Sequence, residues 1–214
     1  APTIYEGPFV GENTANGAVI WCRTTLPVVA SVEIAGQTYR DREATRFHEW
    51  KITGLQPNRN YGYTVKYGDL AQQYELTTAL PKGSREPFVF GYASDSRHAK
   101  GTGERRIYGA NGYIMKRIAA LAYREEAAFV QFTGDMINGY LRNNGEQQLQ
   151  YTNWKKAIEP FWHYMPFYIG MGNHEALGHV FRDEDERWKA FIDGFPYATE
   201  SAEAAFAEAF VNPV

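Results

Sequence analysis

The sequence predicts an amino-terminal all-β sandwich followed by an α/β domain, and three observations support this fold class. Residues 1–82 consist of short alternating segments between regularly spaced glycines, which is typical of a β-sandwich. Beyond residue 88, apolar runs alternate with helix-length segments, which favours parallel strands joined by helices. Residues 83–87 combine glycine, proline and charged residues without periodicity, as expected of a linker. We therefore expect a sandwich over 1–82, a linker over 83–87 and an α/β domain over 88–214.

The sandwich strands are expected where apolar and polar residues alternate between glycine-marked turns. They span residues 18–23, 30–34, 49–52 and 61–67. Trp21 is placed like the core tryptophan of a fibronectin type III or Ig-like sandwich. Residues 55–61 resemble the fibronectin type III pattern in which a tyrosine hydroxyl, here that of Tyr61, bonds back across a corner. Core packing is the expected role of these aromatic side chains, rather than glycan binding.

The composition limits the classes of protein to which this chain can belong. With 214 residues and 44% hydrophobic content the chain can form packed cores, and its net charge of -3 gives no reason to expect nucleic acid as a partner. The single Cys22 excludes an intrachain disulfide framework and a cysteine-based zinc cluster. No apolar run is long enough to cross a bilayer. The chain begins at Ala1 without a methionine, which fits a processed or trimmed N-terminus.

The α/β half is expected to contain three strands and two helices. The first strand is apolar at almost every position, which predicts that both of its faces are covered. The first helix is expected to bury Ile114, Ile118, Leu121 and Ala122, and the second to bury Trp154, Ile158 and either Phe161 or Trp162. A further helix is expected within residues 202–210. The strands are expected at 88–93, 128–133 and from 166 onward, with helices at about 109–124 and within 146–163.

A metal-ligating type of residue follows each of the three predicted strands. The first strand leads to Asp95, the second to Asp135 and the third to Asn173, which is followed by His174. Because the carboxyl ends of parallel strands meet at one edge of a sheet, these side chains are expected to lie together. Carboxylate and amide oxygens beside an imidazole form a site for a hard cation. Singly, each Asp could instead cap a loop or the start of a helix.

These residues also resemble a known family. Asp95, the pair Gly134-Asp135 and the run Gly172-Asn173-His174-Glu175 resemble the first three motifs of the calcineurin-like metallophosphoesterases. With a β-sandwich in front, the chain is most similar to the purple acid phosphatase branch. The resemblance implies a fold of two sheets sandwiched between helices, of which the α/β domain here resembles half.

The resemblance also implies roles for individual residues. Asp135 would bridge two metal ions, Asp95 would hold the first and Asn173 the second, with iron, manganese and zinc all open as their identities. His174 would stabilise the departing oxygen of a phosphate ester or protonate it. Arg97 would clamp the phosphate.

The sequence departs from the family pattern at three points. Many members have histidine where this chain has Arg97, and the purple branch has tyrosine where this chain has Asn138. The later histidine motifs of the family are absent, although His98 and His179 could be further ligands as well as ordinary loop residues. We therefore expect the site to be completed by histidines missing from this chain. The expected partner is the remaining carboxy-terminal half of the same protein, as a second chain or a missing segment, which would cover an otherwise exposed apolar sheet face.

The function that the sequence favours is metal-dependent hydrolysis of a small phosphate ester, outside the cytoplasm and without a membrane span. The alternative is a non-catalytic binding or adhesion module with a degenerate metal site, which Arg97 in place of an expected ligand keeps open.

Overall fold

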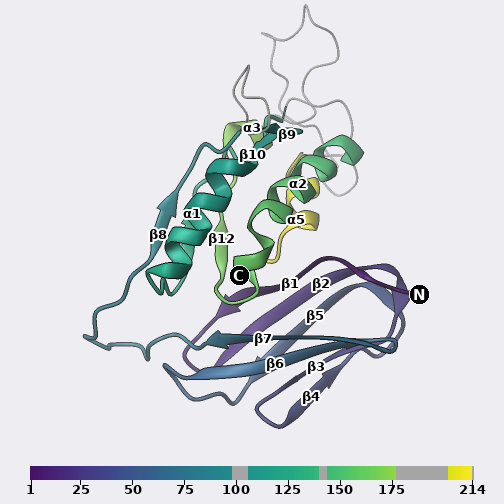
Figure 1. Cartoon of the computed structure of the whole chain (residues 1–214), viewed down its shortest axis with the longest axis vertical. Coiled ribbons are helices and arrows are strands. Elements are labelled where there is room, and N and C mark those ends of the chain that lie inside the picture. The colour runs from purple at the N-terminus through teal and green to yellow at the C-terminus, as the bar shows by residue number, and fades with distance from the viewer. Residues whose placement is uncertain (98–105, 140–143, 177–201, 214) are drawn as a thin grey trace, which may run out of the picture.

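The computed structural model describes residues 1–97, 106–139, 144–176 and 202–213. Two parts are visible in Figure 1, a β-sandwich in purple to blue and an α/β part in teal to yellow. No helix in these described stretches is both long and apolar enough to span a membrane.

The amino-terminal part is a sandwich of two antiparallel sheets. One has the strand order β1-β2-β5 and the other β4-β3-β6-β7. Between them lies an apolar core that includes Val10, Ile20, Val32 and Val65. The strands are β1 (Ile4–Asn13), β2 (Gly17–Val28), β3 (Ala30–Ile34), β4 (Gln37–Arg40), β5 (Thr45–Thr53), β6 (Asn60–Tyr67) and β7 (Leu70–Thr77).

Each of the four sandwich strands predicted from the sequence lies within or coincides with an observed strand, whereas β1, β4 and β7 were not predicted. Strand β1 contains Gly7, Pro8 and Gly11, residues that indicate turns in a sequence, and its pairing with β2 is irregular. The predicted tyrosine contact is confirmed, because the Tyr61 hydroxyl accepts the amide of Gln56 at 2.9 Å.

Trp21 does not lie in the sandwich core, so that prediction is wrong. Successive residues of a strand face opposite sides, and Ala18, Ile20 and Cys22 are the β2 residues that lie in the core. Trp21 is fully buried on the outer face, with its ring 4.6 Å from that of Phe9 and 6.0 Å, edge-on, from that of Trp162. It therefore belongs to the contact between the sandwich and the α/β part.

The α/β part is built on a parallel sheet in the order β12-β11-β8. Its strands are β8 (Gly91–Ala93), β11 (Val130–Phe132) and β12 (Phe167–Ile169), and a short hairpin of β9 (Arg106–Ile107) and β10 (Ala110–Asn111) precedes the first helix. The helices are α1 (Gly112–Arg124), α2 (Asn144–Trp162), α3 (Asn173–Ala176) and α5 (Ala202–Ala209). The predicted alternation of strands and helices is confirmed. The predicted domain boundaries at residues 82 and 88 stay a prediction.

The prediction for helix α1 is confirmed only in part, since Ala122 is buried and Ile118 packs against the core. Its buried residues are Gly112, Met115, Ala119 and Ala122, whereas Ile114 and Leu121 are exposed. The buried stripe consists mainly of small residues, which allow α1 to approach the sheet and α2 closely. Helix α2 agrees with the prediction, since Trp154, Ile158 and Trp162 are all buried.

The expectation that the first strand is covered on both faces is also wrong for the described residues. One face of the parallel sheet packs Val130, Phe132 and Phe167 against the helices.

The opposite face of the sheet is exposed. Phe88, Phe90 and Tyr92, at this face, are each more than half exposed. The rings of Phe88 and Phe90 form a row that continues through Phe129 to Tyr168, with neighbouring centroids 5.3–6.3 Å apart. We call Phe88, Phe90, Tyr92, Phe129 and Tyr168 the aromatic face.

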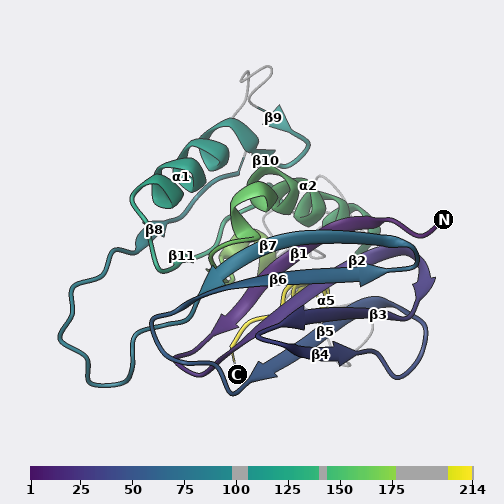
Figure 2. The ribbon, with the colours of Figure 1, turned by 60° about the horizontal axis from the view of Figure 1, so that its bottom comes forward.

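The sandwich is joined to the α/β part through β1 and α2, which lie side by side in Figures 1 and 2. Strand β1 is an edge strand, so its outward backbone groups need partners. The carboxylate of Glu159 accepts the amide of Gly7 at 2.9 Å, and the indole of Trp162 donates to the carbonyl of Val10 at 2.8 Å. His163 Nδ1 donates to the carbonyl of Pro8 at 2.6 Å. Side chains of α2 and its end thus complete the edge of the sandwich.

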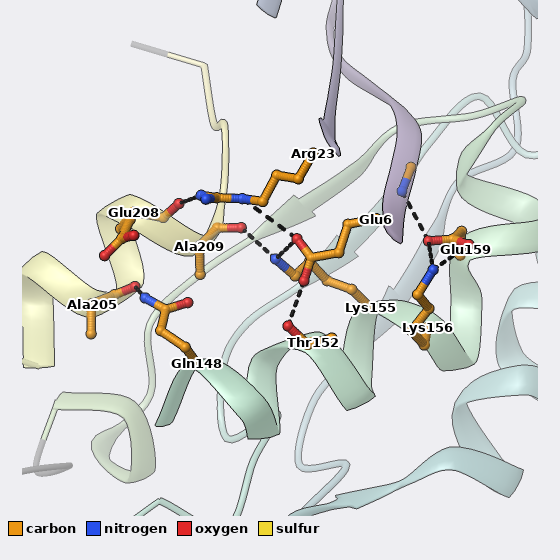
Figure 3. A network of polar contacts seen from close by, with 11 residues as sticks. Glu6, Arg23, Gln148, Thr152, Lys155, Lys156, Glu159, Ala205, Glu208 and Ala209 are labelled. Atoms are coloured by element: carbon orange, nitrogen blue, oxygen red, sulfur yellow. Dashed lines mark hydrogen bonds and ion pairs between the residues drawn. The ribbon is translucent and has the colours of Figure 1, made fainter. Parts of the chain in front are cut away.

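A buried ion pair lies at the centre of this contact (Figure 3). Lys155 Nζ lies 2.7 Å from a carboxylate oxygen of Glu6, and each side chain is only 1% exposed. The same ammonium group donates to the carbonyl of Ala209 at 3.0 Å, which ties the end of α5 to the pair. Arg23 lies 3.5 Å from Glu6 and also donates to the carbonyl of Glu208. A single buried charge network therefore connects β1, β2, α2 and α5.

Removing Lys155 should destabilise the protein strongly. We expect Lys155→Met to lower the free energy of unfolding by about 3–5 kcal/mol, because Glu6 would remain buried without its ammonium partner. The double variant Glu6→Gln/Lys155→Met should lose less than the sum of the single losses. Urea unfolding measures both. Lys156→Met is the control, since Lys156 forms a partly exposed pair with Glu159 that is worth about 1 kcal/mol or less. Equal losses for the two lysine variants would contradict the prediction.

The same lysine should make stability depend on pH above neutrality. Burial lowers the pKa of Lys155 from 10.5 to about 8, while the charge of Glu6 opposes that shift. Between about pH 8 and 10.5 the unfolded chain holds a proton that the folded chain has released. The free energy of unfolding of the wild type should therefore rise with pH in this window, relative to that of Lys155→Met. Parallel pH profiles of the two proteins in urea titrations would show the prediction to be wrong.

Candidate metal centre

The three predicted ligand loops meet at one edge of the parallel sheet. In the register of the strands, Ala93 pairs with Phe132 and Phe132 with Ile169, so all three strands end at the same level. The predicted ligands follow within a few residues of these ends. The topology therefore brings the loops that carry Asp95, Asp135 and Asn173 to a common edge, as the sequence predicted.

Hydrogen bonds connect these loops directly. The amide of Asp95 donates to the carbonyl of Gly134 at 3.1 Å, and the amide of Arg97 donates to the carbonyl of Asp135 at 3.1 Å. The amide of His174 donates to Oδ1 of Asp135 at 3.1 Å. In this last bond Asp135 caps the start of α3, which is the alternative role that the sequence left open for an aspartate here. The bond also joins two loops that are far apart in the sequence.

Both aspartates have a strained backbone. Asp95 has φ of 59° and Asp135 has φ of 52°, in the left-handed region that non-glycine residues seldom occupy. Such strain costs about 1–3 kcal/mol per residue and is commonly found at functional sites. At both positions it turns the chain sharply just after a strand has ended.

The glycines of the second and third motifs are required by close approach of the two loops. A Cβ atom on Gly172 would lie 2.3 Å from Oδ1 and 2.5 Å from the amide nitrogen of Asp135. A Cβ atom on Gly134 would lie 2.3 Å from the amide nitrogen of Gly172. Any side chain at these positions would force the loops apart, so the glycines set the spacing between Asp135 and the third motif.

His174 is buried and held in one tautomer. Its Nδ1 lies 2.6 Å from the carbonyl oxygen of Asn138, which can only accept, so Nδ1 carries the proton. Its Nε2 contacts a guanidinium nitrogen of Arg97, which can only donate, so Nε2 presents its lone pair. Nε2 also lies 4.0 Å from Oδ2 of Asp135. The structure thus brings His174, Arg97 and Asp135 together, with the reactive imidazole nitrogen facing the other two.

The donor groups fit the oxygen ligands that hard metal ions prefer, but they are few. Asp95 and Asn173 are exposed and Asp135 is partly buried, so all three remain accessible. Among the residues that the structure describes, no group of three or more His, Cys, Asp and Glu side chains is arranged to hold a metal ion. His98 and His179 lie outside the described residues. The described residues therefore do not form a closed metal site by themselves.

Sequence reasoning assigned no role to Glu175, which is fully buried beneath the loops. Its carboxylate accepts the amides of Asp135, Ile137 and Gly172 at 2.7, 3.2 and 2.8 Å. Burial raises the pKa of Glu175, while the three amide bonds oppose this shift. The sequence signal was the acidic residue directly after Asn173 and His174.

Side chains of helix α2 form hydrogen bonds to the same loops from the interior of the protein. Gln150 Oε1 accepts the amide of Gly139 at 3.0 Å, and Gln147 Nε2 donates to the carbonyl of Glu175 at 3.2 Å. The indole of Trp154 donates to Oγ of Ser96 at 2.7 Å. None of these polar side chains stood out in the sequence, because a helix pattern does not show which loop a glutamine or tryptophan will contact.

Comparisons with known proteins agree with this architecture. The family model for calcineurin-like phosphoesterases matches residues 102–210, slightly more than half of the chain. The purple acid phosphatase PPD1 from seeds of yellow lupin (Lupinus luteus) matches with a TM-score of 0.68 and 17% identity, over 100% of this chain and 41% of that one. A structure of PhoD matches with a TM-score of 0.64 and 16% identity, over 94% of this chain and 43% of that one.

Among curated proteins, the uncharacterized protein C1020.05 of Schizosaccharomyces pombe is 41% identical over 61 residues, which are 28% of this chain and 11% of that protein. The chain thus spans less than half the length of each of these three proteins. At such low identity the two structures show the fold alone, a β-sandwich followed by an α/β part that resembles half of the metallophosphoesterase fold. On the family match and this fold together, the chain belongs to the calcineurin-like phosphoesterase family.

Proposed function

We propose that this chain carries part of the active site of an enzyme that hydrolyses small phosphate esters with bound metal ions. The observation that carries the proposal is the meeting of three loops, with Asp95, Asp135 and Asn173, at the carboxyl edge of the parallel sheet. Membership of the calcineurin-like phosphoesterase family supports the same class of reaction.

Two metal ions are proposed, with Asp135 between them, Asp95 on the first and Asn173 on the second. Iron, manganese and zinc are all compatible with oxygen and nitrogen donors. When bound, such ions lower the pKa of water and so supply a hydroxide nucleophile near neutral pH. The strained turns at Asp95 and Asp135 would hold the two carboxylates in place before any ion arrives.

His174 and Arg97 are proposed to act on the phosphate ester itself. The bond from Nδ1 to the carbonyl of Asn138 fixes the ring of His174, so Nε2 is the atom at which it would take up a proton and return it to the departing oxygen. The Arg97 guanidinium, which is exposed and reaches Nε2, would donate to the phosphate oxygens.

The site is proposed to be completed by the remaining carboxy-terminal half of the protein, as a second chain or a further segment. The small set of donors among the described residues supports this, because it supplies fewer ligands than two ions need. The aromatic face supports it as well, since exposed apolar patches commonly mark contact surfaces. An extracytoplasmic location is proposed with this function.

One observation favours a second candidate, a binding or adhesion module whose metal site has degenerated. Arg97 stands where many family members have histidine, and its cationic group contacts the imidazole of His174. A guanidinium there adds positive charge where a metal ion would bind. Metal content and hydrolysis separate the two candidates.

Replacing Asp135 tests the proposal. Asp135→Asn should lower the bound metal, because a neutral amide cannot bridge two cations, and should lower p-nitrophenyl phosphate hydrolysis by at least about 100-fold. Elemental analysis after purification without chelator measures the metal, and Asp69→Asn, at an exposed aspartate of the sandwich, is the control. Equal metal content and turnover in both variants would favour the binding module. Little hydrolysis is expected from this chain without the completing half, so the turnover assay uses the protein that contains both.

Replacing Arg97 tests the phosphate clamp. Arg97→Met should weaken inhibition by inorganic phosphate by roughly 10- to 100-fold, since a hydrogen bond between charged groups contributes about 1.5–3 kcal/mol. Arg97→Lys should recover only part of this, because a lysine cannot donate two parallel bonds. Arg85→Met, at an exposed position of the linker, is the control. An unchanged inhibition constant in Arg97→Met would exclude the clamp.

A further inference from the structure

The side chain of Glu175 joins two of the motif loops from the buried side. It comes from α3, is 0% exposed and lies on the interior side of the motif loops. One carboxylate oxygen, Oε2, accepts the amides of both Asp135 and Gly172, at 2.7 and 2.8 Å. The other, Oε1, accepts the amide of Ile137 at 3.2 Å. The first oxygen therefore bridges the second and third motif loops, and the second oxygen fixes the chain just beyond Asp135.

The hydrogen bonds of Glu175 are made to residues whose positions are tightly constrained. Asp135 has a left-handed backbone, and an amide fixed by a carboxylate stabilises that unfavourable turn. Gly172 lies so close to Asp135 that a Cβ atom would not fit between them. A small shift of either loop would change the separation between the Asp135 carboxylate and the side chain of Asn173.

Glu175 is itself held from a third element. Gln147 of α2 donates to the carbonyl of Glu175 at 3.2 Å and to the hydroxyl of Tyr151 at 2.9 Å. Both α2 residues are fully buried. The backbone of Glu175 is thus held by α2, while its carboxylate accepts the three loop amides. This arrangement is typical of groups that orient metal ligands without touching the metal.

We infer that Glu175 is a positioning residue, which sets the separation between Asp135 and Asn173 by holding the amides of Asp135, Ile137 and Gly172. The inference rests on the proposed function, because it assigns Glu175 a task in the metal site proposed there. A carboxylate that served folding alone would contribute to stability without changing the affinity of the loops for a cation.

The experiment compares Glu175→Ala and Glu175→Gln with Glu6→Gln in the protein that contains both this chain and the completing half. Glu6 is the matched control, since it is an equally buried carboxylate in the contact with the sandwich. Calorimetric titration with Mn²⁺ measures affinity, urea unfolding measures stability, and NMR follows the amide signals of residues 135, 137 and 172. Gln can keep the two bonds made by Oε2, whereas Ala keeps none, so the two Glu175 variants should be graded.

We expect Glu175→Ala to lose about 10- to 100-fold in Mn²⁺ affinity, Glu175→Gln to lose less, and Glu6→Gln to retain its affinity at a similar loss of stability. The three amide signals should shift in the Glu175 variants alone. Affinity that falls equally in Glu6→Gln, or that is unchanged in Glu175→Ala, would overturn the inference. If the wild-type protein that contains both halves binds no Mn²⁺, the proposed function fails. NMR then decides the inference, since an unchanged carboxyl signal of Asp135 in Glu175→Ala overturns it.

Discussion

The contact between the edge strand β1 and helix α2 supports the rest of the structure. An edge strand exposes backbone groups that need partners, and α2 supplies them with Glu159 and Trp162 while Lys155 neutralises the buried Glu6. Phe9 and Trp21 of the sandwich and Trp162 of α2 pack together around these polar bonds. The sandwich is therefore part of the same packed unit as the sheet that carries the candidate site.

The same helix reaches the candidate metal centre. On one side α2 binds β1, and from its amino-terminal half Gln147 and Gln150 hold α3 and the loop after Asp135. Its Trp154 fixes Ser96, next to Asp95, by a bond of 2.7 Å. Helix α2 thus contacts both the sandwich and the loops that carry the proposed metal ligands. Loops that must bind cations are more precise when such an element supports them.

At the site itself the structure shows how closely the three motifs are packed. The glycines are necessary because Gly134, Gly172 and Asp135 occupy the same small space, and any added Cβ atom would collide with a backbone or carboxylate atom. The histidine is oriented by a carbonyl on one ring nitrogen and faces Arg97 and Asp135 with the other. Metal, substrate and proton chemistry would therefore share one edge, while Glu175 and α2 lie behind it.

The sequence by itself determined the sandwich followed by alternating strands and helices, and the residues at the tips of the parallel strands, because hydrophobic period, glycine turns and motif spacing are local properties of the chain. It also predicted correctly that the loops carrying Asp95, Asp135 and Asn173 meet, since parallel strands joined by crossovers end at one edge. The outward position of Trp21, the buried face of α1, the exposure of Phe88 and Phe90, and the role of Glu175 were decided only by the tertiary structure. Each depends on which surface an element meets in three dimensions. The local sequence of an element that is apolar on several faces, or of a polar residue that is buried, does not show what that surface will be.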